Sequence, residues 1–108
     1  MKITIGGVEY AVKFEKSRAK IAEDEPLGMI RYTEGTIQVY KKLSPCRIRR
    51  VLMHEIVHGV ITNYSVGQLR HEDGVQDERA VEQLAIGLCE ALESIGIYLP
   101  TEDAGSNA

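Results

Sequence analysis

The chain has 108 residues, of which 27% are charged, and its formal net charge at pH 7 is −3. This length predicts one domain with a core that needs no disulfide, and the near balance of charge gives no global signature of a nucleic-acid binder or an intrinsically disordered chain. Cys46 and Cys89 lack zinc-ribbon spacing, so we interpret them as free thiols of a cytoplasmic protein. With no apolar run of about 18 residues and no leader segment, no membrane association is predicted.

The first forty residues show the alternation of a small sheet. Apolar residues at every second position flank Gly6 and Gly7, which predicts a hairpin whose even-numbered residues from 8 to 14 face the core. Residues 15–25 are polar and predict a loop or short irregular helix, and residues 27–32 and 36–42 predict a second hairpin. We expect the four strands to form an antiparallel sheet, with residues 36–41 at an edge that is open to an extended peptide.

Two helices are predicted after the sheet. Ser44 and Pro45 are typical of the N-cap and first position of a helix, and the apolar residues that follow surround most of its circumference. A second helix is predicted from about residue 77 to residue 95. Its expected buried stripe consists of Val81, Leu84, Leu88, Leu92 and Ile95. The chain therefore predicts an α+β fold, with a single domain over residues 1–99 and a flexible tail over residues 100–108.

The first predicted helix carries the pattern HExxH, formed by His54, Glu55 and His58. Residues i and i+4 lie about 40° apart on a helix and about 6 Å apart along its axis, so both imidazoles can face one metal ion. Glu55 lies about 100° further round, where it reaches a water on that ion rather than the ion itself. Such polar groups inside an apolar helix are costly unless they are paired or bind a metal. The pattern predicts one zinc ion per chain, with Glu55 as the general base.

A third protein ligand is expected because catalytic zinc usually binds three side chains and a water. Glu78 follows His58 by 20 residues and lies on the inward side of the second helix, so it is the predicted ligand. Glu82, one turn later, is placed to hydrogen bond the outer nitrogen of a ligating histidine. His71, in the polar segment between the helices, is the alternative ligand.

HEIVH followed by ERAVEQLAIGL resembles the gluzincin-type metallopeptidases, and the layout of residues 1–99 more closely resembles the ImmA/IrrE-like proteins of phages and mobile elements. The resemblance implies a minimal zincin-like fold with His54, His58 and Glu78 as zinc ligands and Glu55 as general base. The chain departs from the ImmA/IrrE-like pattern in having Glu82 where asparagine is usual, and in lacking an attached DNA-binding domain. A rival resemblance, to SprT-like proteases, implies His71 as the third ligand.

The expected function is zinc-dependent hydrolysis of peptide bonds in a cytoplasmic protein substrate. The alternative is a metal-binding interaction or regulatory protein of zincin fold with little or no protease activity. Five basic residues lie between Lys41 and Arg50, and we interpret them as a solvated rim. No nucleic-acid or membrane partner is predicted from them.

Overall fold

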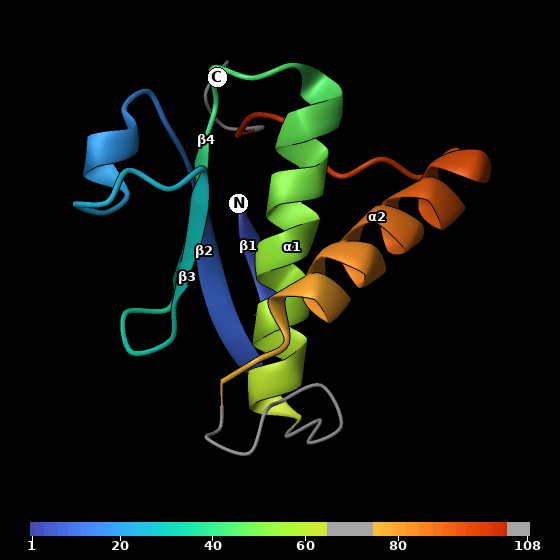
Figure 1. Ribbon diagram of the computed structural model, residues 1–108, viewed down its shortest axis with the longest axis horizontal. Helices are drawn as coiled ribbons and strands as arrows, with labels where there is room; N and C mark the ends of the chain where they lie inside the picture. The colour runs from blue at the N-terminus through green and yellow to red at the C-terminus, as the bar shows by residue number, and fades with distance from the viewer. Residues whose placement is uncertain (65–74, 104–108) are drawn as a thin grey trace.

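Four short strands and two helices form three layers in residues 1–64 and 75–103, which the computed structural model describes. The elements are β1 (Lys2–Ile5), β2 (Val8–Glu15), the 3₁₀ helix η1 (Arg18–Lys20), β3 (Gly28–Arg31), β4 (Thr36–Tyr40), α1 (Pro45–Asn63) and α2 (Glu78–Ser94). The sheet forms one layer, α1 lies on one of its faces, and α2 crosses α1 on the side away from the sheet (Figure 1). The α+β class is therefore confirmed.

The first hairpin has the predicted turn and core face. Gly6 and Gly7 have φ angles of +60° and +79°, the left-handed pair that a two-residue turn of this twist requires. In β2, Tyr10 and Val12 are buried, whereas Val8, next to the turn, is exposed. The second hairpin also forms, with Ile30 of β3 opposite Ile37 of β4.

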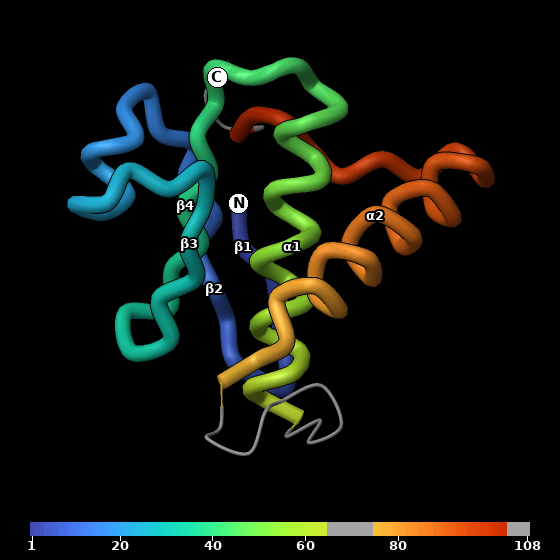
Figure 2. Tube along the Cα trace, viewed as in Figure 1, coloured from blue at the N-terminus to red at the C-terminus, as the bar shows by residue number. Residues whose placement is uncertain are grey.

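The prediction of an antiparallel sheet is wrong, because β2 and β4 pair in parallel. The strand order is β1-β2-β4-β3, so residues 16–27 cross one end of the sheet and place β3 one strand position away from β2, leaving room for β4 between them (Figure 2). β4 is therefore a central strand, and the expectation that residues 36–41 form an open edge is also wrong. The edge strand on this side is β3. Alternation shows which face of a strand is buried but not which strand lies beside it.

Helix α1 separates two clusters of buried side chains. Ser44 caps it, with its hydroxyl accepting a hydrogen bond from the backbone N–H of Arg47 at 3.4 Å, and Pro45 is its first residue. The sheet-side cluster includes Ile48 and Leu52, and the cluster shared with α2 includes Met53, Val57 and Ile61. Burial on two opposite sides explains the wide apolar circumference of this helix.

The buried stripe of α2 agrees with the predicted one at Val81 and, in part, at Leu92, and differs from it at the other positions. Val81, Ala85 and Cys89 are buried against α1, whereas Leu84, Leu88 and Ile95 are exposed. The small side chains of Ala85 and Cys89 allow the two helices to approach, and this leaves the larger leucines outside the contact.

Both cysteines are free thiols, Cys46 exposed and Cys89 buried. Neither helix in the described residues is long and apolar enough to cross a membrane.

Gly28 allows edge strand β3 to lie directly against α1. A Cβ atom at this position would lie 2.6 Å from Val51 Cγ1 and 3.3 Å from Glu55 Cγ. We expect Gly28→Ala to lower the free energy of unfolding by about 1–3 kcal/mol through overpacking. Val51→Ala removes the contacted methyl group, so the double variant should regain part of that loss.

Gly87→Ala is the matched control for this substitution, because a Cβ atom there meets nothing within 4 Å and the site is inside α2. It should raise stability by up to about 1 kcal/mol, since alanine favours helix more than glycine. Urea unfolding of the three variants measures these differences. Equal stability of Gly28→Ala and the parent would contradict the close approach.

Candidate metal centre

The two histidines of HExxH lie one turn apart on α1 and direct their rings to the same side. Their ring centroids are 4.8 Å apart at an interplanar angle of 65°, and the two Nε2 atoms are 3.1 Å apart. Both side chains are largely buried. The helix spacing therefore brings two ring nitrogens together as the sequence pattern requires.

Helix α2 brings Glu78 to these nitrogens. Asp77 caps the helix by accepting a hydrogen bond from the backbone N–H of Ala80 at 3.1 Å, which makes Glu78 its first residue. Glu78 Oε2 lies 3.3 Å from His54 Nε2, and Glu78 Oε1 lies 3.1 Å from His58 Nε2. The three residues form a group whose ligand atoms all lie within 4.8 Å of one another, so they could hold a metal ion.

The spacing of these donor atoms approaches that of a tetrahedral zinc site. Ligand bonds of about 2.0–2.1 Å place any two donors of a tetrahedral site about 3.3 Å apart. The closest atom pairs of His54, His58 and Glu78 are separated by 3.1–3.3 Å, with a different Glu78 oxygen nearest to each imidazole. With one ligand atom per residue, the three donors lie within 4.8 Å of one another. Two imidazoles and a carboxylate are also ligand types that zinc accepts. The side chain of Glu78 is 66% exposed, so the group is open to solvent on the α2 side.

Each histidine has an acceptor at its other ring nitrogen. His54 Nδ1 lies 2.7 Å from Glu82 Oε2, the place expected for Glu82 from the sequence. His58 Nδ1 lies 2.5 Å from Gln76 Oε1. The amide of Gln76 is oriented by its Nε2, which donates to the His58 carbonyl at 3.3 Å and to Thr62 Oγ1 at 2.7 Å. Both Nδ1 atoms must therefore act as donors.

Gln76 was not predicted from the sequence, because a lone glutamine carries no motif. Its only signal is its place two residues before Glu78, where the chain enters α2.

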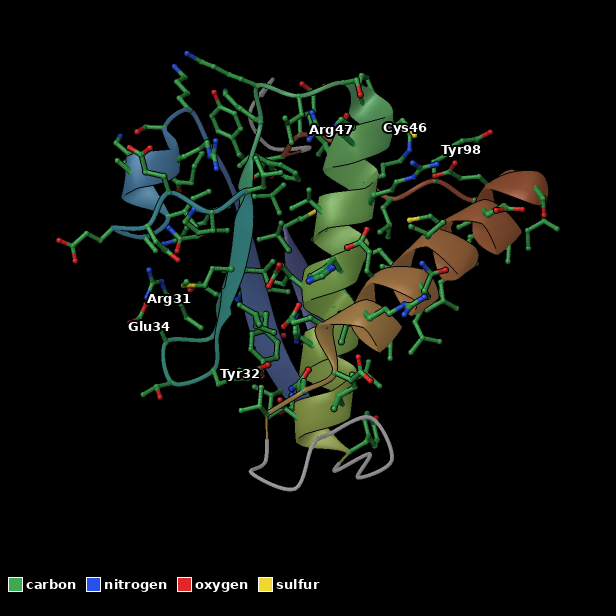
Figure 3. The ribbon with its side chains drawn as sticks, viewed as in Figure 1. Arg31, Tyr32, Glu34, Cys46, Arg47 and Tyr98 are labelled. Atoms are coloured by element: carbon green, nitrogen blue, oxygen red, sulfur yellow. The ribbon has the colours of Figure 1, made fainter. Side chains whose placement is uncertain are left out.

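Tyr32 was also not predicted to lie near the metal centre. It follows β3 and lies against α1, where its hydroxyl donates to the His58 carbonyl at 3.2 Å (Figure 3). His71, the alternative ligand, lies outside the described residues.

We expect Gln76→Ala to weaken zinc binding about 10–100-fold, because it removes the acceptor that orients His58. Gln83→Ala, an exposed glutamine on α2, is the matched control and should leave the affinity unchanged. Competition with a fluorescent zinc chelator measures both. Equal affinities for Gln76→Ala and Gln83→Ala would show that the hydrogen bond to His58 has no role in binding.

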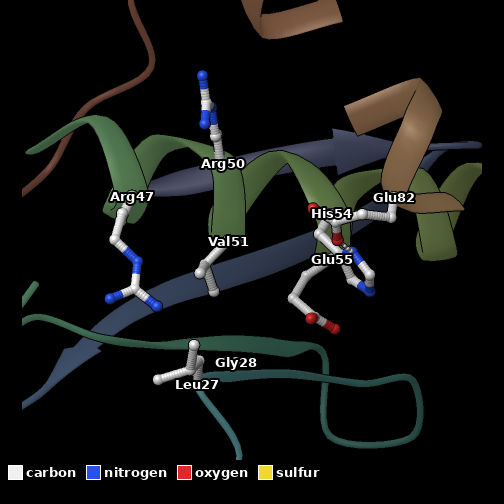
Figure 4. A pocket seen from close by; sticks show the side chains of 8 residues that line it. All are labelled: Leu27, Gly28, Arg47, Arg50, Val51, His54, Glu55 and Glu82. Atoms are coloured by element: carbon white, nitrogen blue, oxygen red, sulfur yellow. Dashed lines mark hydrogen bonds and ion pairs between the residues drawn. The ribbon is translucent and has the colours of Figure 1, made fainter. Parts of the chain in front are cut away.

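Glu55 is buried beside the two histidines, between α1 and β3 (Figure 4). Burial raises the pKa of the Glu55 carboxyl from 4.5 to about 7; the electrostatic interaction with His58 and a backbone hydrogen bond from Ile30 oppose this rise, and the charge of Glu78 adds to it. A carboxyl group with this pKa can take up and release a proton near neutral pH.

The raised pKa of Glu55 has a consequence for the stability of the metal-free protein. The folded state keeps a proton that the unfolded state releases, so stability falls as pH rises from about 4.5 to about 7. Glu55→Gln removes this penalty of about 3 kcal/mol. In chelator-treated protein, it should therefore be more stable than the parent at pH 8 and nearly equal at pH 4.5. A difference that does not change with pH, measured by urea unfolding, would contradict the buried carboxyl.

A cavity of about 430 Å³ adjoins the centre and extends along α1 toward the N-terminus of that helix. His54, Glu55 and Glu82 line one end, and Arg47 and Arg50 line the other. Leu27, Gly28 and Val51 line the part between α1 and the start of β3 (Figure 4). The candidate base and a candidate ligand therefore border a space that can hold part of a peptide.

Comparisons of the chain with protein-family models, with curated proteins and with solved structures gave no match. The function proposed below therefore rests on the geometry of the side chains.

Proposed function

We propose that this protein is a zinc-dependent metallopeptidase of minimal zincin-like architecture, related to the ImmA/IrrE-like proteins, that hydrolyses peptide bonds of a cytoplasmic protein. One zinc ion per chain is held by His54, His58 and Glu78. The observation that carries the proposal is the gathering of two imidazole nitrogens and a carboxylate oxygen within 4.8 Å of one another.

The argument for a cation follows from the hydrogen bonds at Nδ1. Because Glu82 and Gln76 each accept at a ring Nδ1, a neutral imidazole at either position has its lone pair on Nε2. Two such lone pairs face each other at 3.1 Å, with the Glu78 carboxylate equally close. A single proton can bridge only one of these pairs, whereas an ion at the centre binds all three groups. Zinc suits the nitrogen and oxygen donors.

In the proposed hydrolysis, each side chain of the centre has a separate role. A bound zinc ion supplies a Lewis acid that polarises the substrate carbonyl and lowers the pKa of water toward about 7. Glu55 takes the proton of the attacking water and returns it to the amine that leaves. Its pKa of about 7 in the metal-free protein suits this exchange. Glu82 and Gln76 hold the imidazole rings in the orientation that keeps Nε2 free.

The test of the proposal combines metal analysis with a search for cleavage. Protein purified without added metal should contain close to one zinc per chain, and it should cut members of a mixed peptide library in a reaction that chelator stops and zinc restores. Zinc-free protein that gains no zinc on incubation would overturn the metal centre. Protein that contains one zinc per chain but cuts no peptide would overturn the proposed peptidase activity.

A second candidate function is a metal-stabilised interaction protein with little or no protease activity. The observation that favours it is the exposed apolar set on the outer side of α2, formed by Leu84, Leu88 and Ile95. Exposed apolar side chains that lie together on a surface are more common at sites where another protein binds than on the rest of a protein surface. In this case Glu55→Gln would bind its partner as the parent does, and no substrate would be cut by either.

A further inference from the structure

Two of the three arginines at the start of α1 have no side-chain ion pair or hydrogen bond within the described residues. Arg49 pairs with Glu93 at 3.2 Å, and its guanidinium lies 5.1 Å from the ring centroid of Tyr98. The side chains of Arg47 and Arg50 make neither an ion pair nor a hydrogen bond to any residue of 1–64 and 75–103. Their place in the first turns of α1 also opposes the helix dipole, so helix stability does not explain them.

Both of these arginines line the cavity that adjoins the metal centre. Figure 4 shows Arg47 extending from α1 toward Leu27 at the start of β3, whereas Arg50 extends from the opposite side of the helix. The two carboxylates that line the cavity, Glu55 and Glu82, lie at the other end. The cavity is therefore polarised, with the guanidinium of Arg47 at the end away from the centre, acidic groups close to the centre, and Arg50 adding positive charge from the other side of α1.

The helix spacing relates the arginines to a substrate bound at the centre. Arg50 precedes His54 by one turn and Arg47 precedes it by two, which corresponds to about 6 Å and about 10 Å along the axis. An extended peptide advances about 3.3 Å per residue. These backbone positions on α1 therefore lie level with the second and third residues from a peptide bond positioned at the metal, and of the two side chains it is that of Arg47 that extends toward β3 (Figure 4).

We propose that Arg47, assisted by Arg50, binds an acidic side chain of the peptide substrate two or three residues from the bond that is cut. This inference rests on the proposed function and specifies its substrate class. The guanidinium forms a two-pronged hydrogen bond with a carboxylate, which orients the peptide as well as attracting it. The acidic groups at the metal end disfavour an acidic residue next to the cut bond.

The probes for this subsite are peptide hydroxamates, which place a zinc-binding group at the centre. One series carries the hydroxamate at the C-terminus and a second carries it at the N-terminus, because either peptide direction brings a residue to the arginines. Within each series, a single Glu or Gln occupies the first, second or third residue from the hydroxamate. Affinity for the zinc-loaded protein is measured by titration calorimetry.

We expect Glu at the second or third residue of one series to bind about tenfold tighter than Gln, and the difference to shrink at high salt. Arg47→Gln should remove most of the preference and Arg50→Gln a smaller part. Arg79→Gln is the matched control, because Arg79 is next to Glu78 but does not line the cavity. It should keep the preference.

The possible outcomes distinguish failure of the acidic subsite from failure of the proposed peptidase function. Hydroxamates that bind without discriminating between Glu and Gln overturn the acidic subsite and leave the proposed function standing. Selective binding by a protein that cuts no peptide sustains the subsite and overturns hydrolysis. If no hydroxamate binds at all, both proposals fail.

Discussion

Glu55→Gln should lower the rate of peptide hydrolysis by about 10²–10⁴-fold, because glutamine cannot take the proton of the attacking water. The substitution preserves the size of the side chain, and Glu55 is not among the three grouped ligands. Zinc content should therefore remain close to one ion per chain. The measurement is the initial rate on a peptide that the parent protein cuts, with metal content determined on the same preparation.

Glu90→Gln is the control for this experiment, since Glu90 is an exposed carboxylate on α2 that does not line the cavity. Its rate should equal that of the parent. An unchanged rate in Glu55→Gln would rule out the proposed general base. The same variant is expected to be more stable than the parent in its metal-free form at pH 8. Lost activity together with gained stability would identify the buried carboxyl as a functional group that the fold tolerates at a cost.

Glu78→Ala should reduce zinc affinity by more than about 100-fold, beyond the effect expected for a hydrogen-bond partner of a ligand. The variant leaves only two of the three grouped side chains, and catalytic zinc usually requires three. Competition with a chelator and metal analysis after dialysis measure the loss. Circular dichroism on the same samples shows whether the helices remain.

His71→Ala is the informative comparison for the zinc ligand. The sequence allows His71 as the third ligand, and this residue lies outside the part of the chain that the structure describes. If Glu78 is the ligand, His71→Ala keeps its zinc while Glu78→Ala loses it. The opposite pair of results would assign the site to two histidines on α1 and a third from the segment between the helices.

Local patterns in the sequence were sufficient for several elements. Ser44 and Pro45 predicted the start of α1, and Gly6 and Gly7 predicted the first turn, because capping and left-handed backbone depend on residues that are adjacent in the chain. The i and i+4 spacing of His54 and His58 likewise required only the geometry of one helix.

Contacts between distant segments were less predictable. The parallel pairing of β2 with β4 follows from the path of residues 15–27, which has no periodicity. The buried stripe of α2 was misplaced because hydrophobic size suggested leucines, whereas close packing against α1 selected Ala85 and Cys89. Where two helices pack closely, the size of an apolar side chain was therefore a poor guide to whether that side chain is buried.

The sequence by itself determined that two imidazoles and a carboxylate share one helix, since their spacing is a property of the α-helix alone. The sequence also offered Glu78, Glu82 and His71 as neighbours of the histidines, and only the tertiary structure decided that Glu78 and Glu82 reach them. The approach of α2 brings Glu78 and Glu82 to the histidines, the entry to α2 brings Gln76, and Gly28 brings edge strand β3 against Glu55. These contacts join residues 18 to 28 positions apart, so their geometry depends on packing between elements and not on any local pattern.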